Sequence, residues 1–292
     1  MALALVLGGG APPPAPLGLP DDGRVEAWLG AIMSFVSLVV GVLTVGLGLL
    51  GSGALDRPRP VLRSGAAAAA TLWASITLLQ IGLVMSELRG RADVFDSRRV
   101  QALVVQLVIA ALTALAWSLS KRWPTPVVGI VLTCAGLLPV VLVGHPSSAN
   151  NPLIASLTIS GHVVGAAVWV GGLAALAWLA AVDEGDWSGA LPRYSRLALV
   201  CVVALTMFGS IATFGRLDSP AELVTSRYGA IVLLKVVLLA ALITAGWLQR
   251  RHTFRQSPVG RRPFIMIAGL ELFTMTLALA LAAALSRTPP PT

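Results

Sequence analysis

The sequence predicts an all-α protein in which a bundle of helices crosses a membrane many times. Its composition is the first reason: of 292 residues, 56% are hydrophobic and only 12% are charged, with a mean hydropathy of +0.84. Soluble domains of this size do not have such a composition. The second reason is spacing, since the apolar residues form runs of about 20, the length that spans a bilayer as a helix.

Apolar runs separated by short polar or Pro-containing segments set the predicted order of elements. By length there are about eight such runs, and each is expected to form one membrane span. The predicted spans are Ala27–Leu50, Leu62–Ser86, Val100–Ser120, Pro126–Gly144, Leu153–Val182, Arg196–Phe214, Tyr228–Gln249 and Pro263–Leu285. The segments between them are too short to hold a soluble catalytic domain, so any chemistry has to lie within the helices or at their ends.

Pro-rich segments flank the predicted spans at both ends of the chain. Residues 1–25 form an external Pro-rich segment, in which Met1–Gly10 is too short to span a bilayer and resembles the outer end of a helix that starts before this chain. Residues 26–143 form a first set of spans and residues 144–288 a second, which we treat as separate domains. Residues 289–292 form a Pro-rich tail.

Basic residues gather in every second loop, which predicts how the chain is oriented. These loops follow the first, third, fifth and seventh spans and carry Arg57, Arg59 and Arg63, Lys121 and Arg122, Arg193 and Arg196, and Arg250, Arg251, Arg255, Arg261 and Arg262. Because cytoplasmic loops are enriched in Lys and Arg, we expect these loops inside and both chain ends outside a bacterial cytoplasmic membrane. The net charge of +8 therefore reports topology in a lipid bilayer, and no nucleic acid is expected as a partner.

The fifth span, around Thr158–Leu176, contains one ionisable side chain, His162. On a helix, His162 shares a stripe with Gly165 and Trp169, and small residues four apart on the adjacent stripe let a neighbouring helix come close. We expect this histidine to face a packed neighbour, where it needs a metal, a haem iron, a carboxylate or a carbonyl as partner. The predicted packing and pocket-wall residues around it are Trp169, Gly165, Gly171 and Gly172.

Two histidines and three sulfur-bearing side chains are the candidate metal ligands. His145 lies at the predicted outer end of the fourth span, and His162 lies about 14 Å deeper along the next span, which suggests a path leading in from outside. Imidazole binds copper, zinc and haem iron, whereas thioether and thiolate groups favour Cu(I). Each residue also has an ordinary interpretation, as a helix-end or packing side chain. The full candidate set is His145, His162, Met85, Met207 and Cys134.

Two opposite charges lie inside consecutive predicted spans. Lys235 is about eight residues from the outer end of the seventh span, and Glu271 is about as far from the inner end of the eighth. Because an unpaired charge at such depth costs several kcal/mol, we expect Lys235 and Glu271 to form an intramembrane pair. The pair would either fix the packing of the two helices or take part in a relay of protons or ions. In a haem protein, Lys235 would instead lie near a haem propionate.

These residues resemble the copper-resistance D (CopD) family of membrane proteins over about half of the chain. The matching pieces are Gly144-His145, His162 with Trp169-Val170-Gly171-Gly172-Leu173, Arg193-Tyr194-Ser195-Arg196-Leu197-Ala198, Tyr228-Gly229 with Leu234-Lys235, and Glu271. The resemblance implies a copper-handling protein that takes copper up from the outer side toward the cytoplasm. Members of this family often act alongside a small copper-binding protein of the CopC type. The first half is similar to the corresponding part of CopD–CtaG fusion proteins, which implies a CtaG-like oxidase assembly protein as a second partner.

Two other interpretations stay open. The pattern of His162 and Trp169 is also similar to the HemJ family, which would make the protein a haem-binding membrane oxidoreductase with His162 as an axial ligand. A structural membrane subunit would use the same polar residues only to hold its helices together. We favour copper import or delivery without catalysis, because ligand-type side chains at several depths suit an ion path.

Overall fold

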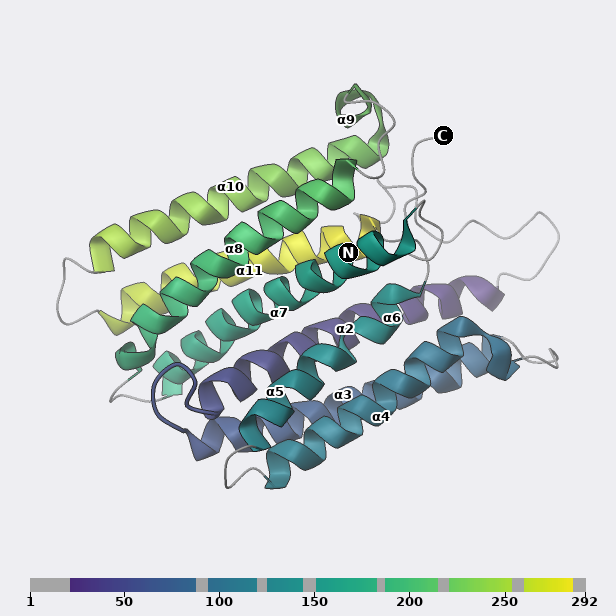
Figure 1. The fold of residues 1–292 in the computed structure, drawn as a ribbon, viewed down its shortest axis with the longest axis horizontal. Helices are drawn as coiled ribbons and strands as arrows, with labels where there is room; N and C mark the ends of the chain where they lie inside the picture. Colours follow the sequence, from purple (N-terminus) through teal and green to yellow (C-terminus); the bar gives the residue numbers. More distant parts are fainter. Residues whose placement is uncertain are drawn as a thin grey trace. The chain divides into compact units, whose positions relative to one another are not determined.

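The structure is a computed structural model, described over residues 22–87, 94–119, 125–143, 151–182, 187–214, 221–253 and 260–285. Within these ranges every regular element is a helix (Figure 1). Seven of the described helices are long and apolar enough to cross a membrane. The predicted all-α, polytopic fold is therefore confirmed.

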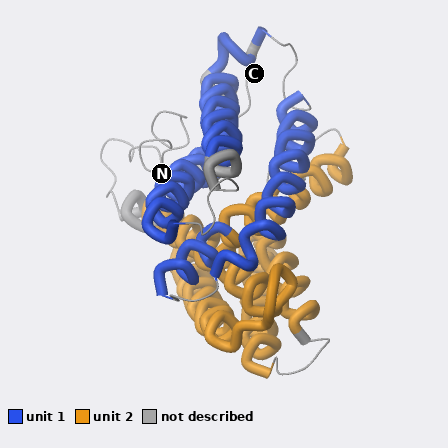
Figure 2. The backbone as a smooth tube through the Cα atoms, turned by 90° about the vertical axis from the view of Figure 1, so that its left-hand side faces the viewer, with its two compact units in different colours: residues 1–11, 173–292 blue, residues 12–172 orange. Residues whose placement is uncertain are grey.

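The chain divides into two compact units (Figure 2). The N-terminal unit is Pro12–Gly172, and the C-terminal unit is Leu173–Thr292 together with Met1–Ala11. The division falls inside one long helix, α7 (Pro152–Val182), which contributes its first part to one unit and its last turns to the other.

The N-terminal unit is a bundle built on α2, α3 and α4. Its other helices are η1, α5, α6 and the first part of α7; the bounds are α2 (Asp22–Gly51), α3 (Pro60–Glu87), η1 (Val94–Asp96), α4 (Arg98–Leu119), α5 (Thr125–Gly136) and α6 (Leu138–Leu142). Helix α3 packs against α2 and α4, and α5 closes the bundle by packing against both α4 and α2. Buried positions on α3 recur every three or four residues, as expected of a helix with one protein-facing stripe. Trp73 lies on that stripe and is fully buried.

The predicted fourth span is a shorter, interrupted helix. Helix α5 ends at Gly136, and α6 starts at Leu138 after a turn in which the Leu137 amide bonds to the Cys134 carbonyl at 3.3 Å. Pro139 lies in the first turn of α6, where its lack of an N–H removes one bond of a continuous helix. This apolar segment therefore falls short of the seven long helices, and an unbroken eighth span is not present among the described residues.

The C-terminal unit contains η3 (Ser188–Ala190), α8 (Leu191–Phe214), α9 (Glu222–Thr225), α10 (Arg227–Thr253) and α11 (Arg261–Leu285), besides the last turns of α7. Helix α10 packs against α11, and a small core forms between them from Ile231, Val232 and Leu281. At the start of α11, the ring of Phe264 stacks on Trp187 with centroids 4.5 Å apart.

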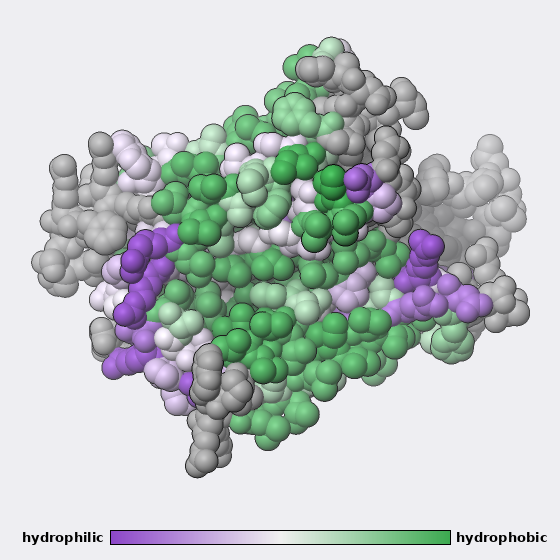
Figure 3. All heavy atoms as spheres, in the orientation of Figure 1, coloured by the Kyte–Doolittle hydropathy of each residue, from purple (hydrophilic) through white to green (hydrophobic). Residues whose placement is uncertain are grey.

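Large apolar side chains cover the outer surfaces of the long helices, and hydrophilic residues gather at helix ends (Figure 3). Such a surface suits hydrocarbon, because lipid tails solvate Leu, Val and Ile as well as a protein interior does. Two arginines donate hydrogen bonds to backbone carbonyls at helix C-termini, where the helix itself supplies no donor. Arg63 donates from Nε to the Gly51 carbonyl of α2 at 2.8 Å, and Arg261 donates to the Ala180 and Ala181 carbonyls of α7.

Candidate functional site

Helix α7 carries His162 in the part of the helix that belongs to the N-terminal unit. His162 is partly buried, and its Nδ1 atom is fully shielded from solvent. One turn before it, Thr158 is buried and donates its hydroxyl to the Ile154 carbonyl at 2.6 Å. Trp169, two turns after it, is also partly buried. The imidazole therefore lies within a membrane helix, at a level where a polar ring needs a specific partner.

Glycines of α7 allow a close helix contact in the N-terminal unit. Gly171 is buried, and its backbone contacts the Val42 carbonyl and Gly46 of α2, so a β-carbon at either glycine would collide with the facing backbone. Gly165 is partly buried, and Gly172 is buried. The contact of α2 with α7 fixes the face of α7 around Gly171, which is the kind of approach that small residues permit.

The sulfur-bearing candidates differ in exposure. Met85 lies in the last turn of α3 and is 36% exposed, and Met207 on α8 is 51% exposed. Cys134 lies near the end of α5 and is partly buried. His145 falls outside the described residues. Among the residues that the structure describes, no group of three or more His, Cys, Asp or Glu side chains could hold a metal ion.

The two charged residues of the C-terminal unit lie on helices that pack together. Glu271 of α11 is buried, and Lys235 of α10 is partly buried. The α10–α11 core sets their register, because Ile231 and Val232 lie beside Leu281. Measured along the helix axes from this core, Lys235 lies about 5 Å away on α10 and Glu271 about 15 Å away on α11. The predicted pair would have to bridge a difference of about 10 Å in height, and it stays a prediction.

A buried polar network in the N-terminal unit was missed by the sequence analysis. The indole Nε1 of Trp73 donates to the Ser37 hydroxyl at 3.0 Å, and the Gln106 amide donates to Ser37 at 3.1 Å and to Thr77 at 3.0 Å. These side chains come from α2, α3 and α4 and are all buried. The bonds tie three helices together inside the apolar bundle, as polar residues commonly do in membranes.

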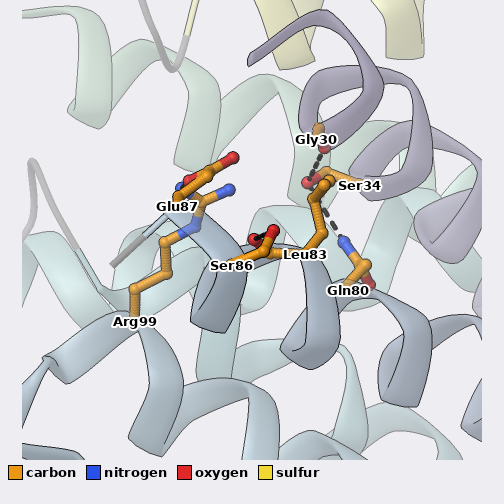
Figure 4. A network of polar contacts seen from close by, with 7 residues as sticks. All are labelled: Gly30, Ser34, Gln80, Leu83, Ser86, Glu87 and Arg99. Atoms are coloured by element: carbon orange, nitrogen blue, oxygen red, sulfur yellow. Dashed lines mark hydrogen bonds and ion pairs between the residues drawn. The ribbon is translucent and has the colours of Figure 1, made fainter. Parts of the chain in front are cut away.

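The network continues toward the end of α3 (Figure 4). Gln80 donates its amide to Ser34 at 3.2 Å, and Ser34 donates its hydroxyl to the Gly30 carbonyl at 2.7 Å. Beyond them, Arg99 and Glu87 form an ion pair of 3.7 Å between the ends of α4 and α3. The signal that would have found this line of polar groups is the presence of two carboxamides, Gln80 and Gln106, inside otherwise apolar spans.

The architecture defines an all-α, polytopic membrane protein with separate polar sites in its two units. Residues 188–285, from η3 to the end of α11, match the model of the family described as Copper resistance protein D, CopD. Over this stretch the chain is similar to the CopD family, whose members are described as copper-resistance proteins. No curated protein and no solved structure matches the chain.

The match covers less of the chain than the resemblance implied. It starts at residue 188, whereas the resembling motifs begin at Gly144. Met207, Lys235 and Glu271 lie inside the matched residues, and His162 lies outside them. The similarity to the CopD family therefore rests on the membrane helices of the C-terminal unit.

Proposed function

We propose that the protein carries copper ions across the cytoplasmic membrane, from the outer side toward the cytoplasm. The observation that carries this proposal is the position of the CopD match, which falls on the long apolar helices α8, α10 and α11. A copper-resistance protein whose family region lies within membrane helices handles its ion there. Copper is then the cargo, and the helices supply groups that replace its water ligands.

Polar groups inside both units support an ion-handling role. In the N-terminal unit, His162 brings an imidazole into α7, and in the C-terminal unit Glu271 brings a carboxylate into α11. Ionisable residues within membrane segments are expensive, and they commonly line ion or proton pathways. Imidazole and sulfur ligands suit copper, and a carboxylate offsets the charge of a cation in a medium of low dielectric constant.

The charge distribution supports a direction for this transport, and the family similarity supports the proposed partners. With basic loops in the cytoplasm, His145 would lie at the outer face, where it would capture the ion. A CopC-type protein would deliver copper to this face. A CtaG-like assembly protein would be a recipient in those cells where copper is needed for an oxidase.

Transport is tested with the purified full chain in liposomes that contain a trapped colorimetric Cu(I) chelator. We expect Cu(I) added outside to form the chelate faster than in protein-free liposomes, and the His162→Ala variant to be slower than wild type. His252→Ala is the matched control, because this histidine follows Arg250 and Arg251 at the end of α10 and is not among the candidate ligands. A chelation rate equal to that of empty liposomes would overturn the proposal. Copper content of cells that express the protein gives the direction, since import raises it.

The visible spectrum of the same preparation decides between copper and haem. Copper handling predicts a protein without a Soret band, which binds Cu(I) and loses part of that affinity in His162→Ala. A Soret band that disappears in this variant would instead assign the histidine as a haem ligand and favour an oxidoreductase. If neither copper nor haem binds, His162 packs helices and the copper proposal is wrong.

A further inference from the structure

The buried face of α11 contains two side chains of metal-ligand type, one helical turn apart. Glu271 is 7% exposed and Met275 is 2% exposed. They share this face with Phe264 and Ala268, also buried, so the four positions follow the spacing i, i+4, i+7 and i+11 of one helix stripe. Residues four apart on a helix have β-carbons about 5–6 Å apart, which lets both side chains reach one ion.

Glu271 has a buried acceptor atom that no described residue satisfies. Its Oε1 atom has no hydrogen-bond partner within the part of the chain that the structure describes. Burying a carboxylate without donors is costly, and buried polar groups in native proteins are generally bonded. The oxygen is thus available to a cation that enters this part of the C-terminal unit.

Met275 supplies the complementary property. Its thioether is a soft, neutral ligand of the kind that selects Cu(I). A thioether leaves the positive charge of the ion unbalanced, and in an apolar medium that charge needs a nearby anion. Glu271, one turn away on the same face, provides that anion.

Two nearby residues of the C-terminal unit, Met266 and Lys235, lie away from Met275 and Glu271. Met266, on the same helix, is 77% exposed, so its thioether faces away from the buried stripe. On α10, which packs against α11, the one ionisable residue between Gly229 and Leu248 is Lys235. It lies about 10 Å from Glu271 along the helix axes, on the far side of Met275.

We propose that Met275 and Glu271 form a Cu(I)-binding site within the membrane, with the Met275 sulfur as ligand and the Glu271 carboxylate as the balancing charge. This inference rests on the proposed copper function and names a site for it inside the CopD-matched residues. It assigns the binding step to the C-terminal unit, whereas His162 belongs to the N-terminal unit.

The test is a Cu(I) titration of the purified full chain in detergent against a competing colorimetric chelator. We expect Met275→Leu and Glu271→Gln each to weaken Cu(I) binding by about tenfold to a hundredfold. Met266→Leu is the matched control and should bind as wild type does. X-ray absorption at the copper edge should show sulfur scattering in wild type and in Met266→Leu, and lose it in Met275→Leu.

Both variants nearly preserve side-chain volume, so the fold is expected to survive, and equal thermal unfolding temperatures check this. If Met275→Leu does not fold, the isosteric Glu271→Gln variant decides by the titration alone. Wild-type affinity and sulfur scattering in Met275→Leu would overturn this site while leaving copper handling intact. A wild-type protein that neither binds nor transports copper would overturn the proposed function, and this site with it.

Discussion

Gly46 of α2 and Gly171 of α7 bring the backbones of their helices into direct contact. A β-carbon built on Gly46 would collide with the carbonyl of Gly171, and one built on Gly171 would collide with the carbonyl of Val42. Such an approach replaces side-chain packing with backbone packing, as small residues allow in membrane helices. It holds α7 against the α2 side of the N-terminal unit.

Replacing Gly171 with alanine should therefore destabilise the protein. The added methyl forces α2 and α7 apart, and overpacking of this kind typically costs about 1–3 kcal/mol. We expect a lower thermal unfolding temperature for Gly171→Ala in detergent. Gly82→Ala on α3 is the control, because no described residue lies within 4 Å of its added β-carbon. Equal shifts in the two variants would contradict the contact.

The hydroxyl of Ser37 is the junction of the buried polar network. It accepts from Trp73 on α3 and from Gln106 on α4 at 3.0 and 3.1 Å, so its removal leaves two donors unsatisfied. Hydrogen bonds between membrane helices contribute about 0.6–2 kcal/mol each, and a buried donor without an acceptor adds to the loss. Ser37→Ala should lower the free energy of unfolding by about 1–3 kcal/mol.

A double-mutant cycle separates this network from general packing. Trp73→Phe removes the indole donor of the same hydrogen bond. The double variant should therefore lose less unfolding free energy than the sum of the losses in the two single variants. Ser75→Ala is the control, because that hydroxyl is exposed and bonds only within its own helix. Strict additivity of Ser37→Ala and Trp73→Phe would show that the two side chains do not act together.

Helix positions could be predicted from the sequence because the length of an apolar run reports a membrane span directly. The exception is the segment around Pro139, where the same apolar composition continues across a break between α5 and α6. The length of an apolar run does not show whether every residue in it can donate a backbone hydrogen bond. The proline decides that point, and it is visible in the sequence only when it is weighed against the run.

The interior of each unit could not be predicted in the same way. In a soluble helix the polar face marks the surface, but lipid and protein interior are equally apolar, so the sequence gives little sign of which face packs. Ser37, Trp73 and Gln106 meet because three helices are rotated toward one another, which no local pattern encodes. His162 and Glu271 could be singled out because ionisable residues are rare in spans, whereas Met275 resembles any apolar filler.

Arg261 should hold the last turn of α7 in place. Its guanidinium donates to the carbonyls of Ala180 and Ala181, groups that have no partner within their own helix end, and its charge suits the negative end of the helix dipole. Arg261→Gln should speed hydrogen exchange in this turn by about fivefold, equivalent to about 1 kcal/mol. Arg262→Gln changes the neighbouring, exposed arginine and should leave the exchange rate unchanged. Unaltered exchange in Arg261→Gln would refute the cap.

The predicted orientation can be checked with single cysteines in a background where Cys134 and Cys201 are replaced by serine. Ser148→Cys places a thiol in the segment without Lys or Arg before α7, and Ser257→Cys places one in the basic segment before α11. Because basic loops remain in the cytoplasm, a membrane-impermeant maleimide should label the first thiol in intact cells and the second only after lysis. The reverse pattern would place His145 at the cytoplasmic face and turn the proposed copper import into export.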